Sequence, residues 1–132
     1  MRRRILGALG TLLCAGLLFA ACGGDSGSSS GGGYTPPKGP SVQTLEIKAS
    51  NFQFDPDKID AKSGITTIKL TDGGGIHTLV FEDAFSGFQL EVSGGGDSSS
   101  GKVDLAAGKK YVFYCNITGH RQQGMEGTIT VK

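Results

Sequence analysis

The stretch YVFYCNITGHRQQGMEGTITV (Tyr111–Val131) holds one cysteine, one histidine and one methionine at equal spacing. Cys115, His120 and Met125 lie five residues apart, between an aromatic and β-branched run and a closing run that alternates Thr with Ile or Val. Such runs are typical of β-strands. We therefore expect one strand to end at Cys115 and another to begin near Thr128, with His120 and Met125 in the loop between them.

The chain from Thr44 onward repeats this pattern of short alternating runs separated by turn residues. No run has helical periodicity long enough to form a helix with one buried apolar face. The sequence therefore predicts an all-β sandwich or barrel of about seven to eight strands. Strands are expected over Thr44–Ser50, Ile65–Thr71, Ile76–Glu82, 87–92, 102–105, Lys109–Cys115 and Glu126–Lys132. A turn is expected at Asp55–Asp57, and a loop over Ser93–Gly101. The expected core includes Phe52, Phe54, Leu70, Leu79, Phe81, Val112 and Ile129.

The first 43 residues differ in composition from the rest. Three arginines precede the apolar run Ile5–Ala21, a pattern typical of a secretory signal, with a transmembrane anchor as the alternative. The run ends in LFAAC, which resembles the lipobox of bacterial lipoproteins and implies a lipidated Cys22; cleavage after Ala21 without lipidation is the alternative. Residues 22–43 are rich in Gly, Ser and Pro, as in a disordered tether. We expect a signal peptide at 1–21, a linker at 22–43, a folded domain at 44–132, and export to the periplasmic or other extracytoplasmic face of a membrane.

Charge and cysteine content limit the function of the domain. From Thr44 onward, nine Lys or Arg face eleven Asp or Glu, a net charge of −2, which argues against nucleic-acid binding. Cys14 and Cys22 lie in the signal and at its end, so Cys115 is the domain's lone cysteine. A lone cysteine in an exported domain is free, is paired with another chain, or binds something.

His77 is the only histidine besides His120, and with Cys115 and Met125 it supplies a soft, mixed set of ligands. Taken singly, such residues are more often core or surface residues than ligands. Taken together, two imidazoles, a thiolate and a weak thioether suit copper that cycles between Cu(I) and Cu(II). Zinc is the nearest alternative, but methionine is a poor fourth ligand for a structural zinc site.

The segment YVFYCNITGHRQQGMEGTITV resembles the C-terminal copper-binding segment of the cupredoxin family, and its Cys-x4-His-x4-Met spacing is most similar to auracyanin. TLEIKASNFQFDPDKIDAKSG resembles the family's opening strands, and HTLVFED the strand that carries the first histidine. The resemblance implies a cupredoxin-like Greek-key fold and one type I copper per domain. It also implies that His77, Cys115, His120 and Met125 are the ligands.

Two positions depart from the commoner family pattern. Ile76 stands where many relatives have Gly or Pro before the first histidine, and Thr78 stands where many have Asn after it. The hydrogen bonds around the ligands therefore cannot be transferred from the family. Position 119 is Gly and the loop has no second cysteine, so a dinuclear copper centre is not expected.

The resemblance implies an electron carrier, not an enzyme, because every plausible ligand belongs to one closed site. His120 is expected to be the electron's exit edge, within a docking patch that includes Ile117, Gly119 and Gly124. Expected partners are redox proteins such as a cytochrome or terminal oxidase, met transiently by a monomeric, membrane-anchored protein. The alternative is a lipoprotein that delivers copper to an oxidase.

Overall fold

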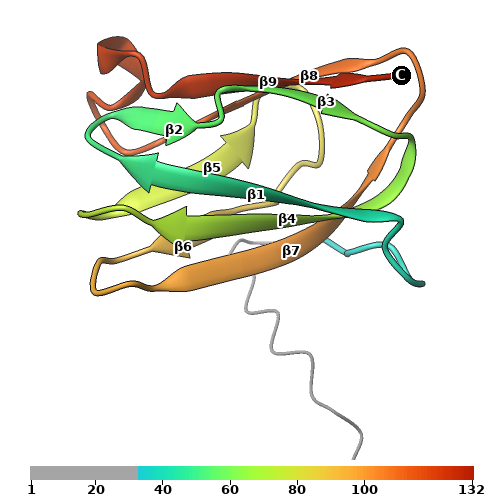
Figure 1. Cartoon of the computed structure of the whole chain (residues 1–132), viewed down its shortest axis with the longest axis horizontal. Helices are drawn as coiled ribbons and strands as arrows, with labels where there is room; N and C mark the ends of the chain where they lie inside the picture. The colour runs from blue at the N-terminus through green and yellow to red at the C-terminus, as the bar shows by residue number, and fades with distance from the viewer. Residues whose placement is uncertain (1–32) are drawn as a thin grey trace, which may run out of the picture.

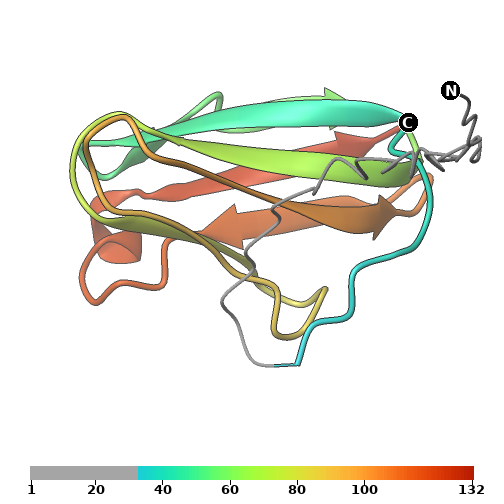
Figure 2. The ribbon, with the colours of Figure 1, turned by 90° about the horizontal axis from the view of Figure 1, so that it is seen from below.

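The computed structural model describes residues 33–132, which form a two-layer β-sandwich (Figures 1 and 2). The predicted signal peptide, Cys22 and the linker as far as residue 32 lie outside the described residues. The elements in chain order are β1 (Gln43–Ser50), β2 (Gln53–Asp55), β3 (Lys58–Ala61), β4 (Gly64–Asp72), β5 (His77–Phe81), β6 (Leu90–Val92), β7 (Ser98–Leu105), β8 (Lys110–Tyr114), the 3-10 helix η1 (Arg121–Gln123) and β9 (Glu126–Val131).

The two sheets have strand orders β2-β1-β4-β7 and β3-β9-β8-β5-β6. The pairs β1–β4 and β3–β9 are parallel, and the other pairs are antiparallel. The predicted all-β sandwich is therefore confirmed, with nine strands among the described residues. The expected number was exceeded because the bend at Pro56 and Asp57 separates β2 from β3, which join different sheets.

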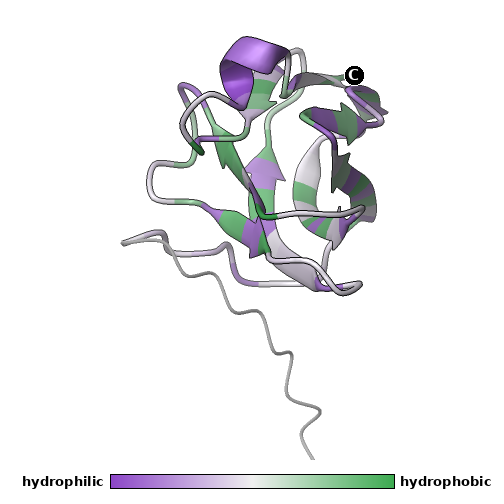
Figure 3. Cartoon of the chain, turned by 90° about the vertical axis from the view of Figure 1, so that its left-hand side faces the viewer, coloured by the Kyte–Doolittle hydropathy of each residue, from purple (hydrophilic) through white to green (hydrophobic). Residues whose placement is uncertain are grey.

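The core lies between the sheets because inward positions on each strand are apolar. Every second residue is buried in the middle of β4 and throughout β9, and Figure 3 shows hydrophobic and hydrophilic residues alternating along the strands. Gly127 on β9 fills a position with no room for a side chain. A Cβ there would press on the ring of the fully buried Phe113 and lie 2.8 Å from the carbonyl oxygen of Asp57. The glycine therefore lets β9 pack closely against β3 and the core.

Three local expectations were wrong. Ser98–Gly101 belongs to β7, because its pairing with β4 supplies hydrogen bonds that local sequence preference does not indicate. Phe52 is 39 % exposed, since its left-handed backbone (φ 61°) places it in the turn between β1 and β2. Val112 is half-buried, not a core residue.

The segment before β1 also contacts the sandwich. The Tyr34 hydroxyl donates a hydrogen bond to the carbonyl of Lys102 (2.9 Å), and its ring meets Phe88 edge-on, with centroids 5.2 Å apart. Within residues 33–132, no helix has the length and apolar character needed to cross a membrane.

Candidate metal centre

Three of the predicted ligands converge at the end of the sandwich that carries η1 (Figure 1). His77 opens β5, Cys115 directly follows β8, and His120 directly precedes η1. One ligand atom from each lies within 4.8 Å of the other two. The antiparallel pairing of β5 with β8, with Val80 opposite Tyr114, brings these distant parts of the chain together.

The hydrogen bonding of His77 leaves one ring nitrogen available to a metal. Its Nε2 lies 2.9 Å from the carbonyl oxygen of Gly74, an acceptor, so Nε2 carries the proton. Nδ1 is then a lone-pair donor. It is buried and has no hydrogen-bond partner among the described residues. A buried polar atom without a partner is unusual in a native protein, and metal coordination would satisfy it.

The thiol of Cys115 is fully buried and is approached from two sides. His120 Nδ1 lies 3.4 Å from Sγ, and the backbone N–H of Thr78 donates to Sγ at 3.4 Å. The rings of His77 and His120 have centroids 5.3 Å apart. The sulfur thus lies beside two imidazoles and accepts a backbone hydrogen bond.

Thr78 and Asn116 connect the two ligand-bearing segments. The Thr78 hydroxyl donates to Asn116 Oδ1 (2.7 Å) and accepts from the Asn116 backbone N–H (3.1 Å). Its single proton is therefore used by Asn116, although Oγ1 also lies 3.5 Å from the sulfur of Cys115. The sequence marked position 78 as a departure from the family, but only the structure reveals Asn116 as its partner.

Met125 is fully buried, and backbone hydrogen bonds fix it at the base of the loop. Its N–H donates to the carbonyl of His120 (3.2 Å), and its carbonyl accepts from the N–H of Cys115 (3.1 Å). Gly124, with a left-handed backbone (φ 101°), ends η1 and turns the chain back toward β9. The loop after β8 therefore leaves and re-enters the sandwich at one point, as the spacing predicted.

The residues present fit copper. The donors are two imidazole nitrogens, a thiol sulfur and a thioether, the set that type I sites use. Nothing in the group resembles the four strong ligands of a structural zinc site.

The expected docking patch is only partly a continuous surface. Ile117 and the half-buried His120 line a shallow apolar hollow, whereas Gly119 and Gly124 lie in the same loop but do not line it. Phe52 and Ile76, which is 58 % exposed, are the other large apolar residues that line the hollow. Phe52 meets the His120 ring edge-on, with centroids 4.9 Å apart. The sequence did not indicate that Phe52 and Ile76 are surface residues beside the site. The departure from the family pattern at Ile76 was the one signal that could have pointed to this surface.

Comparison with known proteins agrees with this geometry. The fold is shared with auracyanin B (17 % identity, TM-score 0.61, 81 % of this chain and 99 % of that one). It is also shared with the dithionite-reduced auracyanin of the photosynthetic bacterium Roseiflexus castenholzii (19 % identity, TM-score 0.57, 71 % of this chain and 99 % of that one). A mutant fern plastocyanin has the same fold (25 % identity, TM-score 0.51, 67 % of this chain and 100 % of that one). No curated protein matches the chain. The family model for copper-binding proteins of the plastocyanin/azurin family matches residues 41–132, and the chain therefore belongs to this cupredoxin family, with His77, Cys115, His120 and Met125 arranged as its type I copper site.

Proposed function

We propose that this protein transfers single electrons between redox partners at the outer face of a bacterial membrane. The observation that carries the proposal is the convergence of Cys115 Sγ with one ring nitrogen each of His77 and His120, all within 4.8 Å of one another. Bound copper would supply a one-electron couple at this point.

The protein's own contribution is to hold the ligands still. Gly74 fixes the His77 ring, Thr78 donates to the Cys115 sulfur, and the His120 carbonyl receives the N–H of Met125. Each constraint comes from backbone groups of the sandwich or its loop, so the fold would hold the ligands in place in either oxidation state of a bound copper. A site that changes little between two oxidation states has a low reorganisation cost, which favours rapid electron transfer.

His120 is the proposed route for the electron. Cys115 and Met125 are fully buried. Both histidines line the apolar hollow, but His77 is only 4 % exposed, whereas His120 is half-buried. A partner that covers this hollow would approach the most accessible ligand while excluding water. Small apolar contacts of this kind suit brief encounters with a cytochrome or a terminal oxidase.

Copper delivery is the weaker proposal. Release would have to proceed from a set in which Cys115 and Met125 are fully buried and His77 is 4 % exposed, which slows transfer to an acceptor. We do not propose an enzyme, because the available donors are used by one site that leaves no strong open coordination position.

The decisive experiment combines spectroscopy with kinetics on the copper-loaded protein. We expect intense visible absorption from thiolate-to-copper charge transfer, a type I EPR signal, and reversible uptake of one electron per copper. Cys115→Ala should abolish the visible band, because it removes the thiolate. A Cys115→Ala protein that kept this band would contradict the proposed site.

A second measurement separates electron transfer from delivery. Stopped-flow reduction by a small soluble cytochrome should be much faster than copper exchange with a chelator. Copper that left the protein faster than it was reduced would favour delivery.

We also propose that the domain is tethered to the membrane through a lipid on Cys22. The support is the LFAAC sequence and the tether-like composition that follows it. Mass spectrometry of the mature N-terminus tests this, and an unacylated Cys22 would contradict it.

A further inference from the structure

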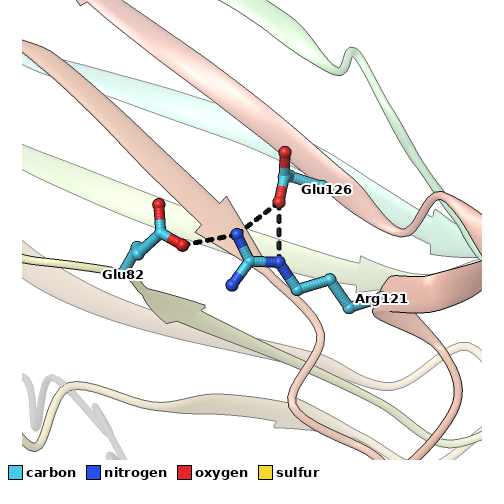
Figure 4. Close-up of polar contacts among 3 residues, drawn as sticks. All are labelled: Glu82, Arg121 and Glu126. Carbon is cyan, nitrogen blue, oxygen red and sulfur yellow. Dashed lines mark hydrogen bonds and ion pairs between the residues drawn. The ribbon is translucent and has the colours of Figure 1, made fainter.

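Arg121, the residue after His120, makes a dense set of contacts that the ligand arrangement does not explain. Its Nη2 lies 2.6 Å from Glu82 Oε1 and 2.6 Å from Glu126 Oε2, and its Nε donates to Glu126 Oε2 at 2.7 Å (Figure 4). Its guanidinium carbon also lies 4.1 Å from the ring centroid of Tyr114. One side chain is thus held by two carboxylates and an aromatic face.

Each of these contact residues directly precedes or follows a copper ligand or the strand that carries one. Tyr114 precedes Cys115, Glu126 follows Met125, and Glu82 directly follows β5, the strand that His77 opens. Tyr114 is also paired opposite Glu126 across β8 and β9. The backbone of Glu82 is held against β8, because its N–H donates a hydrogen bond to the Val112 carbonyl at 3.0 Å.

The loop that Arg121 belongs to has few other anchors. No residue of η1 is buried, and its N-terminus has no side-chain cap. Among the described residues, the other side-chain hydrogen bond from η1 runs from Gln123 to the carbonyl of Gly119, within the same loop (3.3 Å). Arg121 is therefore the side chain that ties η1 to the strands on either side.

A single exposed ion pair would contribute little, and these side chains are 34–44 % exposed. The arrangement differs from a single pair because both carboxylates share one planar guanidinium that also stacks on a ring. Such a fork fixes direction as well as distance, which matters more for ligand geometry than for overall stability.

We propose that Arg121 is a positioning residue of the metal centre. Held by Glu82, Glu126 and Tyr114, it fixes the segment from His120 to Met125 against the ends of β5, β8 and β9 before copper binds. The proposal rests on the proposed function of the site, because it assigns Arg121 a role in keeping the ligands in one arrangement. A role in attracting an acidic partner is less well supported, since two carboxylates already face this one cation and leave the cluster net negative.

The test compares Arg121→Met and Arg121→Lys with Lys69→Met in the full-length protein. Lys69 forms a similar exposed ion pair with Glu46 (2.8 Å) on the other sheet and serves as the matched control. In the copper-free protein, Arg121→Met should speed amide hydrogen exchange of residues 117–125 by about three- to tenfold. In the copper-loaded protein, it should shift the visible and EPR spectra and the reduction potential. Lys69→Met should change none of these.

Arg121→Lys keeps the charge but loses the planar fork, so it should resemble Arg121→Met more than the wild type. Glu82→Gln is a second, milder variant that weakens one arm of the fork and should shift the same readouts in the same direction by less.

A wild-type spectrum and potential in Arg121→Met would overturn the proposal, even with faster loop exchange, because Arg121 would then stabilise the loop without positioning the ligands. If Arg121→Met does not fold, unchanged spectra in Glu82→Gln and Glu126→Gln would overturn it. A wild-type protein without a type I spectrum would instead refute the proposed function. Hydrogen exchange of the loop in the copper-free variants would still show whether Arg121 holds the loop in place.

Discussion

Thr78 is the residue that joins the two ligand-bearing segments most directly. It is 3 % exposed, and its hydroxyl both donates to and accepts from Asn116, while its backbone N–H serves the sulfur of Cys115. The hydroxyl and the backbone N–H thus have separate roles, which a substitution of the side chain can separate.

Thr78→Val removes the hydroxyl with little change of shape and keeps the backbone donor to Cys115. We expect the copper-free protein to lose about 1–2 kcal/mol of unfolding free energy, because the Asn116 N–H is left without its acceptor. The visible band of the copper-loaded protein should persist. Urea unfolding and the absorption spectrum check both expectations. Thr67→Val, which removes a hydroxyl bonded to Ser41 (2.7 Å), is the control, and equal losses in the two variants would contradict the special role of Thr78.

The ligands could be predicted at this scale because their identities are so restricted. A domain with one cysteine and two histidines offers few alternatives, and the spacing from Cys115 to Met125 indicates a single loop. The groups that orient the ligands could not be predicted. The Gly74 carbonyl lies only three residues before His77, but a backbone group leaves no mark in the sequence. Asn116 and Glu82 contact Thr78 and Arg121 across 38 and 39 residues, and only the packing of the strands brings them together.

At the scale of elements, alternation predicted the strands that have one buried face, such as β4 and β9. It failed at Ser98–Gly101, where four residues with little strand preference complete a ladder with β4. It also failed at Phe52, because an aromatic residue in a turn has the same composition signal as one in the core. In both cases the tertiary partner, absent from a local pattern, decides the outcome.

Asp72 ties together two loops at the copper end. Oδ1 accepts from the N–H of Gly74 (2.7 Å) in the loop before β5, and Oδ2 accepts from the N–H of Gly96 (3.0 Å) in the loop before β7. These hydrogen bonds, that of Gly74 first, hold the pKa of Asp72 below its ordinary value of 3.8. Because the folded-state pKa is the lower one, the carboxylate stabilises the fold above about pH 3.8, and this contribution is lost as the pH falls through the folded-state value.

Asp72→Asn should therefore lower the urea midpoint of the copper-free protein near neutral pH. The gap to the wild type should narrow as the pH falls below about 4, where the wild-type carboxyl also becomes neutral. Asp83→Asn is the control, since Asp83 is exposed and its carboxylate accepts no hydrogen bond among the described residues. A gap that stayed constant with pH would mean that Asp72 acts through its shape and not its charge.

At the scale of the whole molecule, the site connects parts of the chain that are far apart in sequence. His77 and Cys115 are separated by 37 residues that include β6 and β7, and Met125 leads directly into β9. The unfolded chain would have to bring these residues together against its own entropy, whereas the folded sandwich already holds them within reach. Copper should therefore bind the folded state in strong preference to the unfolded state.

This preference makes copper a stabiliser of the whole sandwich. A ligand present at about a thousand times its dissociation constant stabilises the folded state by about 4 kcal/mol when it does not bind the unfolded chain. We expect a higher urea midpoint with copper than without, and slower hydrogen exchange concentrated in β5, the end of β8 and the start of β9. Cys115→Ser should abolish most of the gain, because the buried sulfur is the ligand that joins the two segments. An equal gain in urea midpoint in Cys115→Ser would show that copper stabilises the protein from another position. Protection from hydrogen exchange that extended evenly over β3 and β7 would argue against a site confined to one end of the sandwich.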